Sequence, residues 1–182
     1  AAVIATALGH AAAPTPFLGS AILAPRLVAA GSDAQRKEWL PKLAAGELRL
    51  GVAIAEQVER RDDAGVSLDG GKLRGIALFA IDGAGADAYL VAAGDALALV
   101  AKSAPGLTVE PMPTIDRTRR LAELRFEGTP AELLARGDAA RGAIADALLA
   151  ARVALAADML GACDRSLAMS VDYAKQRKQF DR

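Results

Sequence analysis

The sequence predicts an α+β fold in three consecutive parts: a helical segment, a small antiparallel β-sandwich or barrel, and one long helix. Three observations predict it. Residues 1–48 have helical spacing and capping residues, residues 49–133 have short apolar runs between turn residues, and residues 134–182 contain no proline and are mostly helical in pattern. With 182 residues, of which 53% are hydrophobic, the chain has ample apolar material for a core.

The first part is predicted to end in a capped helix. In GSDAQRKEWLPKLAAGE, Gln35 follows Ser32 by three positions, which is the spacing of a capping box. We expect Pro41 to mark a kink or a new first turn, and Gly46 to stop the helix.

The second part is predicted to be antiparallel strands. Apolar runs such as GVAIAE, KLRGIALFAID, AYLVAA and LAELRFEG recur about every dozen residues, as is typical of sandwiches and barrels. GAGAD at residues 83–87 contains G-x-G after a strand, but no helix begins there. A dinucleotide-binding loop is therefore not favoured, and Asp82-Gly83 instead indicates a hairpin turn.

The third part is predicted to be a single helix over residues 138–178 that needs neighbours. A helix this long and this apolar requires other helices to cover it, so we expect it to begin a bundle completed by residues absent here or by another subunit. It ends in DYAKQRKQFDR. The cations suit a helix C-terminus, but the phenylalanine is not explained by that.

Composition excludes several classes of function. Lys and Arg number 22 and Asp and Glu number 22, so no net charge attracts nucleic acid or an anionic membrane surface. Charged residues interrupt the longest apolar run, so we expect no membrane span, and the start lacks a basic flank, which favours the cytoplasm. Cys163 is the only cysteine and is expected to be a buried thiol. His10 is the only histidine, so the chain lacks the residues for common metal sites and for catalytic triads.

Three stretches of the chain resemble the acyl-CoA dehydrogenase family. They are GSDAQRKEWLPKLAAGE, GKLRGIALFAIDGAGADAYLVAA and MLGACDRSLAMSVDYAKQRKQF, and TIDRTRRLAELRFEG is similar to the run that enters the family's helical bundle. The resemblance implies the C-terminal part of an N-terminal helical domain at 1–48, a middle β domain at 49–133, and the first long helix of a C-terminal four-helix bundle at 134–182.

The resemblance also implies an FAD site. By motif, Arg177 and Gln179 would contact the pyrophosphate of a flavin in a neighbouring subunit, and Phe180 would lie near its adenine. Guanidinium and amide donors suit phosphate oxygens, which agrees with these roles. Phe79 and Ile81 stand where the family has Trp and Thr beside the flavin ring.

The match is eroded where the family places its hydroxyl groups. The usual T-E-P is Ala55-Glu56-Gln57 here, so only Glu56 is kept, and it is either a substrate contact or a plain edge-strand carboxylate. Arg152 matches an active-site arginine of the family, or it only pairs with an acid such as Asp146. RTRR at residues 117–120 is expected to be a solvated or subunit-facing cluster rather than a phosphate site.

Two functions follow from the resemblance. The first is an FAD-dependent dehydrogenase that desaturates an acyl-CoA thioester, as a dimer or tetramer that passes electrons to an acceptor. No residue present is nominated as the catalytic base, because the position used by some branches is Ala151. The second is a non-catalytic partner subunit of a paralogous dehydrogenase. TRRLAELRF is similar to heteromeric actinobacterial members that act on steroid-type CoA thioesters.

Overall fold

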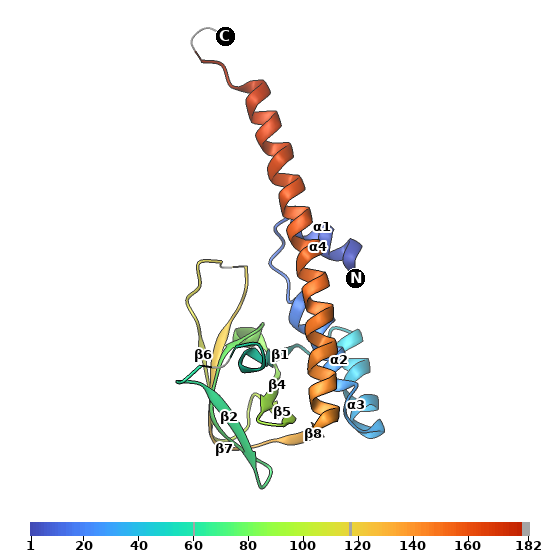
Figure 1. Cartoon of the computed structure of the whole chain (residues 1–182), viewed down its shortest axis with the longest axis vertical. Helices are drawn as coiled ribbons and strands as arrows, with labels where there is room; N and C mark the ends of the chain where they lie inside the picture. The colour runs from blue at the N-terminus through green and yellow to red at the C-terminus, as the bar shows by residue number, and fades with distance from the viewer. Residues whose placement is uncertain (60, 117, 180–182) are drawn as a thin grey trace. The chain divides into compact units, whose positions relative to one another are not determined.

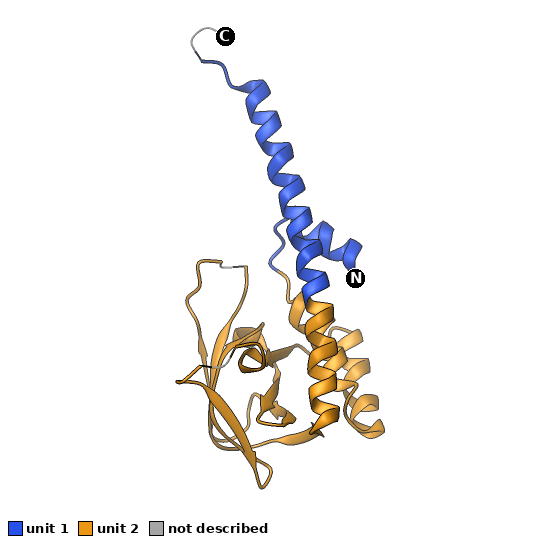
Figure 2. Ribbon diagram, in the orientation of Figure 1, with its two compact units in different colours: residues 1–14, 152–182 blue, residues 15–151 orange. Residues whose placement is uncertain are grey.

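The computed structural model describes residues 1–59, 61–116 and 118–179 of the chain. These residues form two compact units, which are coloured separately in Figure 2. One unit is Thr15–Ala151, and the other combines Ala1–Pro14 with Arg152–Arg182. The long C-terminal helix contributes to both units, so the three-part division at 1–48, 49–133 and 134–182 stays a prediction.

The larger unit begins with three short helices. They are a π-helix η1 (Phe17–Leu23), α2 (Ala24–Val28) and α3 (Asp33–Ala44). The predicted capping box of α3 is confirmed, because Ser32 Oγ accepts from Gln35 N and Gln35 Oε1 accepts from Ser32 N at 2.8 Å. α3 runs through Pro41, so no new first turn begins there, whereas Gly46 at φ +73 does follow the helix end.

The described residues of this unit form eight strands in two four-stranded sheets (Figure 1). The strands are β1 (Leu50–Ala53), β2 (Gly65–Asp69), β3 (Lys72–Ala80), β4 (Ala88–Ala93), β5 (Ala96–Ala101), β6 (Leu107–Pro111), β7 (Ala122–Pro130) and β8 (Glu132–Arg136). One sheet has the order β1-β4-β5-β8 and the other β2-β3-β7-β6. The second sheet is antiparallel throughout.

The core lies between the inner faces of these two sheets. Tyr89 and Val91 of β4 pack in one buried cluster with Leu73 of β3 and Phe126 of β7. Each such side chain contributes about 1.5 to 3 kcal/mol when it is fully withdrawn from water. The buried Tyr89 hydroxyl donates to the Gly83 carbonyl at 3.1 Å, so its polar atom is satisfied inside the core.

Two details of the predicted β domain are corrected. The segment from Asp82 to Asp87 is no hairpin turn, because β3 and β4 belong to different sheets and the segment, with the 3-10 turn η3 (Gly83–Gly85), carries the chain across. In addition, β1 pairs with β4 in parallel, not antiparallel as expected. Strands β2 and β8 had no clear signal in the sequence pattern.

Helix α4 (Asp138–Gln176) is the single long helix that the sequence predicts. In the larger unit its buried positions follow helical spacing: Ala140, Ile144, Ala147 and Ala151. In the smaller unit it crosses α1 (Ala2–His10) very closely. A Cβ on Gly9 would lie 1.9 Å from the Asp158 carbonyl oxygen, and one on Gly161 would lie 2.0 Å from the Thr6 carbonyl oxygen.

Asp82 links the η1 helix to the end of strand β3. Its backbone is left-handed at φ 57, and its Oδ2 accepts from Gly19 N at 2.9 Å. A Cβ on Gly19 would lie 2.3 Å from that oxygen, so only glycine permits the approach. Burial raises the pKa of Asp82, although the Gly19 hydrogen bond and the Arg119 charge both favour the carboxylate.

Replacing Asp82 by asparagine is expected to stabilise the protein at pH 7. The pKa is raised on folding, so the folded state binds more protons and stability falls as pH rises from the unfolded pKa of about 3.9 through the folded value. Asn keeps an oxygen for Gly19 N and tolerates the left-handed backbone, without a buried charge. Thermal unfolding between pH 4 and 7 should show Asp82→Asn above wild type at pH 7, with a flatter pH profile.

Two further variants complete this test. Asp82→Ala should lose about 1 to 2 kcal/mol, because Gly19 N is left without its acceptor. The control Asp69→Asn removes an exposed carboxylate and should change little. An Asp82→Asn protein less stable than wild type at pH 7 would show that the charge of Asp82 stabilises the fold.

Candidate functional site

The candidate site is a pocket of about 300 Å³ within the larger unit. We call it the Phe79 pocket. Its lining residues come from β1, η2, β3, α4 and four connecting segments: Val52, Ile54, Ala55, Val58, Glu59, Arg61, Phe79, Ile81, Leu121 and Leu148. Apart from Glu59 and Arg61 all of them are apolar, so the pocket suits a flat or aliphatic group.

Phe79 is turned into the pocket by a β-bulge in strand β3. Between Ala77 and Ala80 the strand advances three residues while its partner β7 advances two, from Leu124 to Ala122. The additional residue bends the strand, and Phe79 itself has a left-handed backbone at φ 55. A bulky residue in that conformation is strained, so other contacts must hold it there.

Glu56 is the side chain that holds this bulge. It lies on the 3-10 turn η2 (Ala55–Gln57), and its Oε1 accepts from Leu78 N at 3.1 Å in a partly buried setting. The bond satisfies the backbone amide next to Phe79, which the bulge removes from the regular ladder. Glu56, predicted as a substrate contact or an edge-strand carboxylate, therefore lies where it positions Phe79.

Ile81 lines the pocket with its apolar side chain and offers no hydrogen-bond donor there. Its backbone amide and carbonyl are both used in a bridge to Val52, with N to O distances of 2.9 Å in each direction. Ala55 likewise has no hydroxyl. The two positions at which the family resemblance implies hydroxyl donors are thus apolar walls in this structure.

Arg61 is the one side-chain hydrogen-bond donor among the described residues that line the Phe79 pocket. Its guanidinium carbon lies 4.9 Å from the centre of the Phe79 ring, which is a cation–π contact. Sequence reasoning did not single out Arg61. The signal was present as the charged loop VERRDD between η2 and β2, but nothing in the pattern indicates that one of its arginines folds back onto an aromatic ring.

The other predicted site residues belong to the C-terminal part of the chain, where Arg152 is on α4 and Arg177 and Gln179 follow the end of that helix. Arg152 is exposed, and Asp146, its expected alternative partner, instead forms an ion pair with Arg26 at 3.5 Å. Arg177 lies over the Tyr173 ring, 5.3 Å from its centre. Gln179 is exposed, and Phe180 lies outside the described residues. These positions belong to the smaller unit, so their roles stay predictions.

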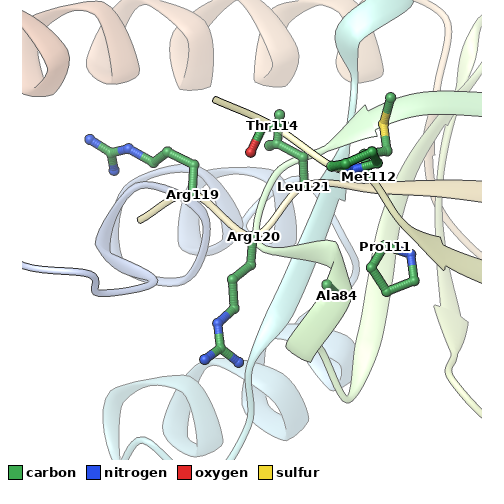
Figure 3. A pocket seen from close by; sticks show the side chains of 8 residues that line it. Ala84, Pro111, Met112, Thr114, Arg119, Arg120 and Leu121 are labelled. Atoms are coloured by element: carbon green, nitrogen blue, oxygen red, sulfur yellow. The ribbon is translucent and has the colours of Figure 1, made fainter. Parts of the chain in front are cut away.

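A second pocket of about 460 Å³ lies beside the RTRR cluster (Figure 3). Its walls are mainly Ala84, three residues that follow β6, and Leu121, together with Arg119 and Arg120. Figure 3 shows the two arginine side chains pointing in different directions. Arg119 pairs with Asp116 at 3.9 Å and Arg120 is exposed, so these two cations do not converge on one anion.

The sequence predicts that the chain has no metal site, no membrane span and a buried Cys163. Within residues 1–59, 61–116 and 118–179, no group of His, Cys, Asp and Glu side chains is arranged to hold a metal ion. The helices of that same part of the chain are too short or too polar to cross a membrane. The expectation that Cys163 is buried is wrong, because this cysteine is exposed on α4.

Removing the Glu56 carboxylate is expected to release the bulge. Glu56→Ala should cost about 1 to 2 kcal/mol in the free energy of unfolding, because Leu78 N loses its acceptor. Glu56→Gln should cost much less, since the amide oxygen still accepts. Amide hydrogen exchange at Leu78 is the direct measurement: protection should fall in Glu56→Ala and persist in Glu56→Gln.

The matched control for this test is Glu47→Ala, which removes an exposed glutamate elsewhere in the larger unit. It should leave the exchange of the Leu78 amide unchanged. If Glu56→Ala also leaves that exchange unchanged, the hydrogen bond does not hold the bulge.

The chain is similar to known proteins over its whole length. A family model described as acyl-CoA dehydrogenase, N-terminal domain, matches residues 1–47. Acyl-CoA dehydrogenase IpdE2 of Mycobacterium tuberculosis is 32% identical over 183 residues, which covers 100% of this chain and 46% of the relative. The chain thus spans about half the length of the curated relatives it matches.

Solved structures show the same fold. The Tcur3481-Tcur3483 steroid ACAD variant superposes with a TM-score of 0.80 at 30% identity, covering 100% of this chain and 51% of that one. A glutaryl-CoA dehydrogenase from Mycobacterium smegmatis in complex with FADH2 has a TM-score of 0.73 at 26% identity, covering 91% and 46%. The predicted α+β fold is confirmed, and the chain belongs to the acyl-CoA dehydrogenase family.

Proposed function

We propose that the protein is an FAD-dependent dehydrogenase that desaturates an acyl-CoA thioester between its α and β carbons. The observation that carries this proposal is the Phe79 pocket. It brings Ala55, Phe79 and Ile81 together from separate segments, and these are the positions that the family resemblance places beside the flavin ring. The similar glutaryl-CoA dehydrogenase is named as a complex with FADH2, which supports the choice of cofactor.

The residues of the pocket fit a flavin ring in part. The Phe79 ring and the aliphatic walls suit a flat aromatic system, whereas Ile81 and Ala55 offer it no hydroxyl donor. When bound, FAD supplies the acceptor for the hydride that leaves the β carbon. The protein's own part is to orient the ring against Phe79, to keep water away from it, and to hold the bulge through Glu56.

The residues that follow α4 supply the proposed contacts to a neighbouring subunit's flavin. Arg177 and Gln179 are exposed, so their donors are open to a phosphate group, and Phe180 keeps its proposed place near the adenine. Arg152 stays a proposed substrate contact. We nominate no catalytic base, and location in the cytoplasm and transfer of electrons to a further acceptor remain predictions.

A non-catalytic partner subunit is the second candidate function. Two observations favour it: the described lining of the pocket lacks the hydroxyl donors, and the smaller unit exposes several large apolar side chains on α4. They are Met159, Leu160, Leu167, Met169, Val171 and Tyr173. So many exposed apolar side chains on one helix favour a contact with further protein, either a second copy or a paralogous dehydrogenase subunit. The similar steroid ACAD variant carries two designations, Tcur3481 and Tcur3483, which agrees with pairing of two subunits.

The visible absorption spectrum of the purified protein separates the two functions. We expect a bound flavin when the protein is produced alone, and bleaching of that flavin when an acyl-CoA is added, with turnover once an artificial electron acceptor is present. Phe79→Ala should weaken flavin binding about tenfold through loss of ring contact, whereas Phe17→Ala, outside the pocket, should not.

A colourless protein that becomes yellow only when co-produced with a paralogous dehydrogenase would favour the partner subunit. A yellow protein whose flavin is never reduced by any acyl-CoA would contradict dehydrogenase activity.

A further inference from the structure

Arg61 gives the Phe79 pocket a chemical preference that its apolar walls do not have. Among the described lining residues, all others except Glu59 are apolar, so Arg61 is the one cationic donor that this part of the chain offers to an occupant. A charge on such a wall interacts more strongly than in water, because the surroundings are less polarisable. The position of Arg61 therefore bears directly on what the pocket selects.

The Arg61 guanidinium is held in place and still has donors to offer. Phe79 supports one face of it, and the side chain is 32% exposed. Nη1 donates to the Glu59 carbonyl at 3.2 Å, and Nη2 lies 3.6 Å from the Glu59 carboxylate. A guanidinium has five N–H donors in a rigid plane, so these two contacts do not use them all.

Glu59 acts as a weak internal counter-ion to Arg61. Its carboxylate is 77% exposed and its 3.6 Å separation is longer than a charge-assisted hydrogen bond, so solvent screens most of the attraction. An anionic group that enters the pocket competes with Glu59 for the same guanidinium and can bind it through two parallel hydrogen bonds, which an apolar occupant cannot do.

We propose that Arg61 binds negatively charged oxygen atoms of the molecule that occupies the Phe79 pocket. The identity of that molecule rests on the proposed function. Its charged oxygens come either from a carboxylate at the far end of the acyl group or from the ring of a reduced, anionic flavin. In both cases Phe79 supports the guanidinium while the apolar walls hold the rest of the occupant.

The proposal makes opposite predictions for the two charged residues of the pocket. Arg61→Met keeps a long apolar side chain without charge, so it should weaken binding of an anionic occupant about tenfold. Glu59→Gln removes the competing carboxylate and should tighten the same binding. A variant that merely damages the fold cannot tighten binding, so the pair distinguishes recognition from misfolding.

The test compares matched ligands by titration calorimetry on the protein. Adipoyl-CoA and hexanoyl-CoA both carry six-carbon acyl groups, but only the first ends in a carboxylate. FAD affinity and the midpoint potential of bound FAD are measured in parallel. Arg141→Met is the control, since Arg141 is an exposed α4 residue outside the pocket.

Two results would support the proposal and identify the source of the charge. If the acyl group supplies it, Arg61→Met abolishes a preference for adipoyl-CoA over hexanoyl-CoA and Glu59→Gln increases that preference. If the flavin supplies it, both CoA thioesters are unaffected, while Arg61→Met lowers the midpoint potential of bound FAD because the anionic reduced form loses its cation.

Other results would overturn it. Unchanged ligand affinities and potential in Arg61→Met, with the ligands still bound, would sink this inference alone and leave the proposed function standing. Arg61-dependent binding of adipoyl-CoA without any turnover would support the inference and contradict the dehydrogenase. A wild-type protein that binds neither CoA thioester nor FAD would contradict both.

Discussion

The hydrogen bond from Leu78 N to the Glu56 carboxylate is the contact on which the candidate site depends. A strand bulge leaves a backbone amide without its ladder partner, and a strained left-handed residue such as Phe79 persists only where its surroundings compensate. Glu56 provides both compensations from a separate segment of the chain. That carboxylate holds the backbone next to Phe79, whose ring forms part of the pocket wall.

Local chemistry made part of the fold predictable. The Ser32 and Gln35 capping box and the long proline-free helix were read from residue types alone, because caps and helix periodicity are set by near neighbours. The turn at Asp82 and the parallel pairing of β1 with β4 were not, because both depend on which sheet a strand joins. A turn sequence between two strands does not say whether those strands pair.

The candidate site was predictable in the same uneven way. Phe79 and Ile81 were identified through a family motif and do share one pocket, whereas Arg61 was missed. Motif reasoning compares positions that resemble the family, and Arg61 lies in a loop that does not. The cation–π contact with Phe79 arises from three-dimensional proximity, and no spacing rule in the sequence indicates it. The residues that do not match the family motifs therefore say most about what distinguishes this protein's pocket.

We propose that the Phe79 pocket holds a flavin ring or the acyl group that reacts with it. A crystal structure of the protein grown with FAD and an acyl-CoA is the decisive measurement. We expect electron density for the ring or the acyl chain against Phe79, with a charged oxygen beside the Arg61 guanidinium. Density for both ligands elsewhere, with Arg61 still over Phe79 and paired with Glu59, would contradict it.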